Sequence, residues 1–183
     1  LYLWLMFAPL FMPIFLLFGW LWREKTQADW RQGVTLVVVL IVSLYLLSVL
    51  LGFGMARTSP DGQLFTSQGA SSFTSLLFSA LLHRLNYGIS LLTLALLLIA
   101  GLSYLLGFVP RDAQEKEIVD PLPFILLLVI LAGLMALAPE FVYLRDHFGT
   151  RMNTVFKFYY QAWMLWSLAA AFGAVLILKD GKL

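Results

Sequence analysis

The chain has 183 residues, of which 61% are hydrophobic and only 12% are charged. Soluble domains contain roughly 45–50% apolar and about 25% charged residues, so this composition excludes an ordinary soluble domain, a disordered chain and a nucleic-acid-binding protein. The formal net charge of +2 points to no particular partner, and the absence of cysteine excludes disulfides and thiolate metal sites. The class that remains is a polytopic membrane protein.

Five apolar runs are long enough to cross a bilayer, whose hydrocarbon core of ~30 Å needs about 20 residues of helix. They cover residues 1–22, 34–53, 88–109, 122–138 and 155–178. Pro9 and Pro13 predict a kink in the first run. Pro121 and Pro123 open the short fourth run, and Pro139 closes it. The sequence therefore predicts an all-α fold, a polytopic transmembrane helix bundle with five spans.

The long loop after the second span contains a helical pattern of its own. Apolar residues recur there at spacings of three and four, namely Phe73, Leu76, Leu77, Ala80, Leu81 and Leu85. A polar stripe occupies the opposite face, namely Ser72, Ser75, Ser79, His83 and Asn86. This pattern predicts one amphipathic helix lying in the membrane interface.

The basic residues give a weak orientation. Five spans place seven Lys and Arg residues on the side of the first loop, the third loop and the tail, against five on the other side. Basic residues favour the cytoplasmic side, so loops 54–87 and 139–154 are predicted to be extracytoplasmic. The chain starts at Leu1 inside an apolar run. We therefore expect a single transmembrane domain, residues 1–183, that forms the C-terminal part of a longer protein.

Polar and charged residues are concentrated where the fourth span ends and the fifth begins. The candidate site residues are Glu140, Arg145, Asp146, Arg151, Asn153, Lys157, Tyr160 and Gln161. Ionisable groups at the mouth of a span are costly unless they are paired or face a cavity. Asp146 and His147 are neighbours, but two adjacent residues specify no coordination set, so no metal site is assigned.

One face of the fifth span is polar at its outer end and small toward the middle. Its members are Asn153, Lys157, Tyr160, Met164, Ser167 and Ala171. At about 100° per residue they fall within about 40° of one line, and we name them the polar stripe. This pattern predicts that the polar stripe looks toward protein or water, while the Leu, Phe and Trp faces look toward lipid. The tryptophans lie mostly near span ends, which is typical of an aromatic belt.

Two interpretations of the charged region remain open. Cations near a helix N-terminus are unfavourable by roughly 0.3–1 kcal/mol each, and both Arg151 and Lys157 lie near this one. In the first interpretation, Glu140 and Asp146 neutralise them as ordinary ion pairs. In the second, a bound phosphate is held by the cations and the helix N–H groups together.

The stretch from Glu140 to Gly173 resembles the C-terminal region of the YYY membrane protein family, a domain of unknown function in certain bacteria and archaea. The most specific part is RMNTVFKFYYQAW, residues 151–163, whereas the first ~110 residues are similar only in hydrophobicity. That family looks like a distant branch of the GT-C glycosyltransferases, polytopic enzymes that take a sugar from a polyprenyl-phosphate donor at the extracytoplasmic face.

The resemblance implies an active site on the outer side of the plasma membrane and a lipid-linked phosphate as ligand. Phosphate binding would fall to Arg145, Arg151 and Lys157, and orientation of the donor to Asn153, Tyr160 and Gln161. Glu140 or Asp146 would act as general base on an acceptor hydroxyl or as ligand of a divalent metal ion. GT-C enzymes place a catalytic acid in their first outer loop, whereas the only acid in loop 54–87 is Asp61.

Two other functions are compatible with the sequence. A non-enzymatic structural or accessory subunit of a larger membrane complex would explain the incomplete catalytic set and the many small and aromatic residues. A transporter would use the kinked first span, although no inverted repeat and no charge near a span centre supports it.

Overall fold

The computed structural model describes residues 2–58, 78, 81–82, 88–108, 121–141 and 152–180. Its helices are α1 (Tyr2–Arg23), α2 (Trp30–Thr58), α5 (Gly88–Gly107), α6 (Leu122–Phe141) and α7 (Met152–Asp180). All five are long and apolar enough to cross a membrane, and the described ranges contain no strand. The prediction of an all-α bundle with five spans is confirmed.

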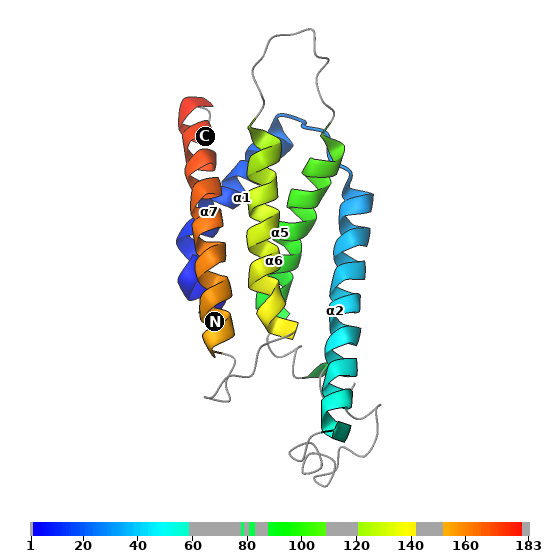
Figure 1. The fold of residues 1–183 in the computed structure, drawn as a ribbon. Helices are drawn as coiled ribbons and strands as arrows, with labels where there is room; N and C mark the ends of the chain where they lie inside the picture. Colours follow the sequence, from blue (N-terminus) through cyan, green and yellow to red (C-terminus); the bar gives the residue numbers. More distant parts are fainter. Residues whose placement is uncertain are drawn as a thin grey trace.

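Successive helices run in opposite directions, so α1 and α7 run the same way, and α1 crosses behind α7 at an angle (Figure 1). α2 packs on α5, α5 on α6 and α6 on α7, while α1 packs on α7 and also contacts α5. We name the end where α1 meets α2 the α1–α2 end, and the opposite one the α6–α7 end. Which of the two faces the cytoplasm stays a prediction.

The second span begins four residues earlier than the apolar run predicts, because Asp29 caps α2. Its Oδ1 accepts a hydrogen bond from the amide N–H of Gln32 at 3.0 Å, and its carbonyl accepts one from Gly33 at 3.0 Å. A carboxylate in this position satisfies a backbone donor that the first turn leaves open. The amide of Asp29 donates to the carbonyl of Ser103 at 2.8 Å, which ties the start of α2 to α5.

The prediction that Pro139 ends the fourth span is wrong. The proline lies inside α6, which continues to Phe141. A proline in the last turn removes one backbone hydrogen bond without interrupting the turns before it, so the helix tolerates it there. The expected amphipathic helix of residues 72–86 lies outside the described residues except for Phe78, Leu81 and Leu82, which are helical and exposed.

Aromatic rings join α1 to α7 in the interior. The side chain of Trp166 is fully buried, and its ring meets Phe7 edge-on at a centroid distance of 4.8 Å and Phe11 at 5.0 Å. Tyr159 extends the cluster, with its ring centroid 5.3 Å from that of Phe7. This cluster fixes the rotation of α7 and therefore decides which of its side chains face outward.

Candidate functional site

The predicted site residues that the structure describes belong to two helices at the α6–α7 end. Glu140 lies in the last turn of α6, whereas the others lie in the first three turns of α7, namely Asn153, Lys157, Tyr160 and Gln161. Arg145, Asp146 and Arg151 lie outside the described residues, as does His147. The described part of the site is therefore one carboxylate on α6 and four polar side chains on α7.

The buried face of α7 is not the polar one. Its buried residues are Thr154, Tyr159, Ala162, Trp166, Ala169, Ala170, Gly173 and Ile177. They centre on the line of Trp166, roughly opposite Lys157 around the helix. The prediction that the tryptophan faces look toward lipid is wrong for Trp166, because its ring fills the space between α1 and α7. Trp166 also departs from the predicted aromatic belt, since it is fully buried in the bundle.

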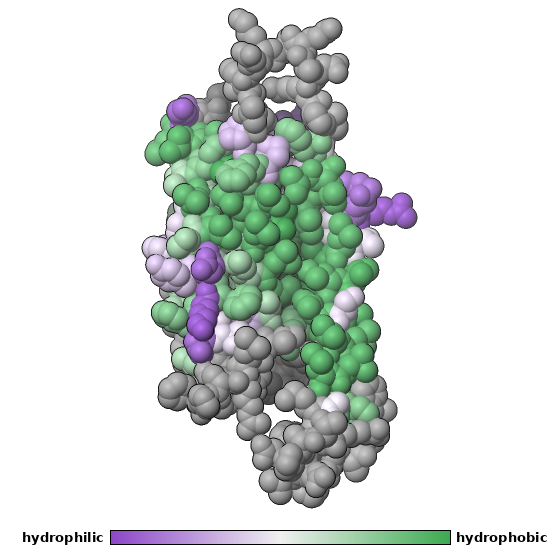
Figure 2. Space-filling model, viewed as in Figure 1, coloured by the Kyte–Doolittle hydropathy of each residue, from purple (hydrophilic) through white to green (hydrophobic). Residues whose placement is uncertain are grey.

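The polar stripe faces outward from the bundle. Asn153, Lys157 and Gln161 are exposed, and Tyr160 has 56% of its surface exposed. Figure 2 shows the consequence, a strip of hydrophilic atoms over the lower half of α7 within a largely apolar surface. A polar group on the outer face of a span is expensive in contact with hydrocarbon, so this strip needs water, headgroups or another protein beside it.

The depth of Lys157 follows from the length of α7. The helix has 29 residues, or about 43 Å at 1.5 Å per residue, against a hydrocarbon core of about 30 Å. A centred helix therefore extends about 7 Å past the hydrocarbon at each end. Lys157 follows Met152 by five residues, about 8 Å along the axis. Its backbone is thus near the boundary between hydrocarbon and headgroups, where lipid phosphates lie.

Glu140 points to the other side of α7. Its Oε1 accepts a hydrogen bond from the hydroxyl of Tyr159 at 3.2 Å, and the Tyr159 side chain is only 5% exposed. Tyr159 and Lys157 are two residues apart, about 200° around the helix. The structure therefore does not bring Glu140 onto the polar stripe with Lys157.

Sequence reasoning missed Tyr159, which it passed over for its neighbour Tyr160. The angular position of Tyr159, opposite the polar stripe, could have indicated that it faces another helix. That conclusion requires knowing which face of α7 is covered by α1 and α6, and this depends on contacts between segments distant in sequence.

The ion-pair interpretation expected Glu140 and Asp146 to neutralise the cations at the α6–α7 end, and Lys157 is the cation that the structure describes there. Lys157 has no ion-pair partner among the residues that the structure describes. The ion pair found in these ranges is that of Arg23 Nε with Glu24, at 3.9 Å. The described ranges also hold no group of three His, Asp or Glu side chains that could bind a metal ion. Lys157 is therefore available to an anion from outside the described ranges.

Replacement of Tyr159 by Phe is expected to lower the free energy of unfolding by about 1–2 kcal/mol, because a half-buried carboxylate loses a hydroxyl donor while the ring packing stays. The matched control is Tyr160→Phe, which removes an exposed hydroxyl and should change the free energy by less than about 0.5 kcal/mol. Unfolding in mixed detergent micelles, followed by tryptophan fluorescence, measures both. Equal effects of the two variants would show that the Glu140–Tyr159 bond contributes nothing.

A family model described as "Uncharacterized membrane protein (DUF2298)" matches residues 1–166. The match includes the first 110 residues, where the sequence alone offered only hydrophobicity, and it reaches into α7 as far as Trp166. No curated protein and no solved structure matches the chain.

Proposed function

The chain belongs to the DUF2298 family of uncharacterized membrane proteins, and from this premise we propose that it is glycosyltransferase-like and binds a polyprenyl-phosphate sugar donor at the α6–α7 end. The observation that carries the proposal is the outward-facing polar stripe, on which Lys157 is exposed. The similarity of residues 140–173 to the YYY proteins, and through them to GT-C enzymes, supplies the reaction class. The α6–α7 end is then the extracytoplasmic one.

A lipid-linked donor reaches its enzyme sideways through the bilayer. It therefore meets the outer face of a helix before any interior pocket, and Lys157 is exposed on that face. An ammonium at the hydrocarbon boundary is desolvated on one side, which strengthens its attraction to a phosphate. Asn153 and Gln161 flank it at spacings of four residues and add amide donors on the same face.

The transfer step places distinct demands on these residues. An acceptor hydroxyl attacks the anomeric carbon of the sugar, the bond from that carbon to the phosphate oxygen breaks, and polyprenyl phosphate leaves with the bonding electrons. Lys157, with Arg145 and Arg151, neutralises the charge that develops on the leaving phosphate. A carboxylate takes the proton of the acceptor hydroxyl.

Glu140 and Asp146 are the two candidates for that base. The bond from Tyr159 holds Glu140 toward the packed side of α7, so Glu140 serves the reaction only if the acceptor approaches between α6 and α7. Asp146 lies in the connection between these helices, and a divalent metal ion bound there would be an alternative way to activate the hydroxyl.

The test is sugar transfer by the full-length protein in proteoliposomes, with a panel of polyprenyl-phosphate sugars as donors. Replacing Lys157 by Gln removes a charged hydrogen bond and should lower kcat/KM at least about tenfold. Lys157→Arg should retain most of the activity because the charge stays. The matched control is Lys179→Gln, at the opposite end of α7, which should leave transfer unchanged.

Binding of polyprenyl monophosphate by the same variants separates the ligand from the reaction. Weaker binding to Lys157→Gln than to Lys179→Gln supports the assigned phosphate site. Wild-type turnover and wild-type binding in Lys157→Gln would remove Lys157 from the mechanism and leave the polar stripe without its proposed ligand.

A second candidate function is an accessory subunit of a larger membrane complex. The C-terminal half of the polar stripe favours it, because Ala171 is exposed and Ser167 is half-buried, and such small side chains let another helix approach closely. Purification from native membranes with a mild detergent distinguishes the two. A stoichiometric second protein supports the subunit, whereas a stable isolated monomer with transfer activity contradicts it.

A further inference from the structure

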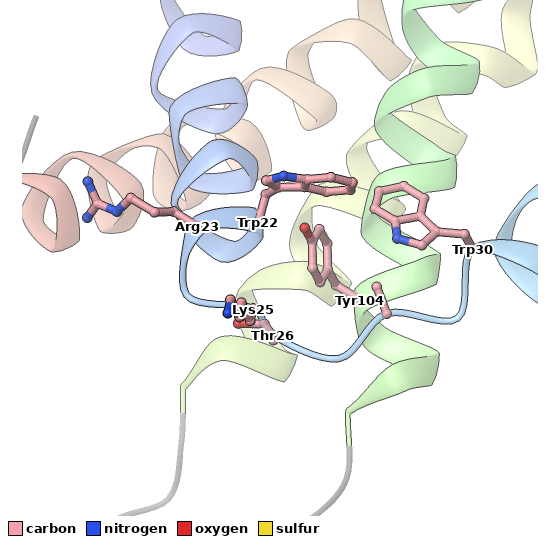
Figure 3. A pocket seen from close by; sticks show the side chains of 7 residues that line it. Trp22, Arg23, Lys25, Thr26, Trp30 and Tyr104 are labelled. Atoms are coloured by element: carbon pink, nitrogen blue, oxygen red, sulfur yellow. The ribbon is translucent and has the colours of Figure 1, made fainter.

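A hollow at the α1–α2 end, far from the polar stripe, has a lining of unusual composition. Its volume is about 560 Å³, and its walls include Trp22, Arg23, Lys25, Thr26, Trp30 and Tyr104. Figure 3 shows the three aromatic rings gathered on one side of the connection between α1 and α2, with Lys25 and Thr26 on that connection. It therefore combines an apolar wall with a cation and a hydroxyl.

Backbone hydrogen bonds fix the conformation of the α1–α2 connection, which carries Lys25. Lys25 adopts a φ of 53°, in the left-handed region that non-glycine residues rarely occupy, and its amide donates to the carbonyl of Trp22 at 3.2 Å. The next amide, that of Thr26, donates to the carbonyl of Leu21 at 3.1 Å. The bond from Asp29 to Ser103 anchors the far end. Such local strain persists only where the surroundings hold it, so Lys25 is placed by the fold.

The aromatic rings form a continuous wall of the hollow. The centroid of Trp30 lies 6.0 Å from that of Trp22 and 5.5 Å from that of Tyr104. At these separations neighbouring aromatic rings are in contact with each other.

Lys25 is the cation that the hollow offers. The guanidinium of Arg23 points away from the rings in Figure 3, and its Nε lies 3.9 Å from Glu24. Lys25 has no ion-pair partner in the part of the chain that the structure describes. The carboxylate of Asp29 is the nearest acid in sequence after Glu24, and it is engaged in capping α2. An anion is therefore the complementary ligand.

The surroundings point to a lipid as the source of that anion. Trp30, Val34 and Val38 follow one another at intervals of four residues on one face of α2, and they are 39%, 42% and 51% exposed. An exposed apolar strip thus leads from the hollow along the span, where an acyl chain can lie. Trp22 is 68% exposed at the mouth, a position typical of tryptophan at the membrane interface.

We propose that this hollow binds the phosphate of an anionic phospholipid headgroup, with Lys25 and Thr26 on the phosphate, Trp22 and Trp30 against the glycerol backbone, and the acyl chain on the strip of Trp30, Val34 and Val38. The site is independent of the glycosyltransferase proposal, since it lies at the other end of the bundle. Its ligand is a resident membrane lipid rather than a substrate.

Native mass spectrometry of the protein released from nanodiscs tests the assignment. With phosphatidylglycerol and phosphatidylcholine in equal amounts, the wild-type protein should retain phosphatidylglycerol preferentially. Lys25→Gln should reduce that retention roughly tenfold, because it removes a charged hydrogen bond. The matched control is Lys179→Gln, which removes an exposed cation of α7 that does not line the hollow and should leave retention within about twofold. A thermal melt of each variant checks that it is folded.

Competition with soluble glycerol phosphate distinguishes the two sources of phosphate. Retention of phosphatidylglycerol in millimolar glycerol phosphate supports a lipid site, whereas its displacement would show a site for soluble phosphate and overturn the lipid assignment. Equal retention of both lipids by the wild type, or equal losses in Lys25→Gln and Lys179→Gln, would overturn the proposal as well.

Discussion

Replacement of Trp166 by Ala is expected to lower the free energy of unfolding by about 3–5 kcal/mol, the usual cost of truncating a large buried aromatic side chain. The side chain is fully buried, it meets Phe7 and Phe11 edge-on, and its Nε1 donates to the carbonyl of Val129 at 3.3 Å. In a bilayer the bundle is held by such contacts rather than by exclusion of water, so lost packing is not offset by lipid. Unfolding in mixed detergent micelles measures the loss.

The neighbouring turn provides the control. Trp163 lies on the same helix but is 49% exposed, so Trp163→Ala should cost less than about 1 kcal/mol. Trp166→Phe keeps most of the ring packing and should cost less than Trp166→Ala, which keeps the test interpretable if the alanine variant does not fold. Equal losses at positions 163 and 166 would contradict the assignment of the packed face of α7.

The spans were predictable because their signal is local. An apolar run of about 20 residues is sufficient to predict a membrane helix, whatever it packs against. The ends of the helices were harder to predict than their existence, because they depend on individual residues outside the apolar runs. The start of α2 depends on Asp29, a capping residue placed before the apolar run, and the end of α6 depends on how many turns remain after Pro139.

The orientation of each helix could not be predicted from hydropathy. Lipid and protein interior are equally apolar, so Trp166 and Trp163 look alike in the sequence although one is buried and the other exposed. The partner of Trp166 is α1, about 155–160 residues earlier in the chain. A shorter separation of 19 residues hid the role of Tyr159, whose hydroxyl is directed at Glu140 only because α6 and α7 pack together.

The polar stripe was expected to look toward protein or water, but the bundle packs on the opposite face of α7, and its role as a site stays a prediction. Its members do share one face of α7, and that face is exposed. The carboxylate expected beside them points to the packed side instead. Glu140 of α6 and Lys157 therefore lie on different sides of α7, so their variants should differ in kind: Glu140 variants in stability, Lys157 variants in phosphate binding.

Gly107→Ala is expected to lower the free energy of unfolding by about 1–3 kcal/mol, because the added methyl group has no room. A Cβ at this last residue of α5 would lie 2.6 Å from Ala28 Cα and 2.6 Å from the carbonyl oxygen of Gln27. Both are backbone atoms, which cannot rotate away, so the connection between α1 and α2 must move. That movement strains the bond from Asp29 to Ser103 and, with it, the hollow that holds Lys25.

Gly19→Ala gives the opposite sign in a helix of the same bundle. A Cβ there meets no atom within 4 Å, and the position is exposed inside α1. The substitution should raise the free energy of unfolding by about 0.5–1 kcal/mol, since glycine costs that much in a helix interior. Parallel denaturation of the two variants compares a glycine in close contact with backbone atoms with a glycine that has open space around it. Stabilisation by both substitutions would show that the α1–α2 connection is not in close contact with α5 at Gly107. The backbone conformation at Lys25 would then not be held by this contact.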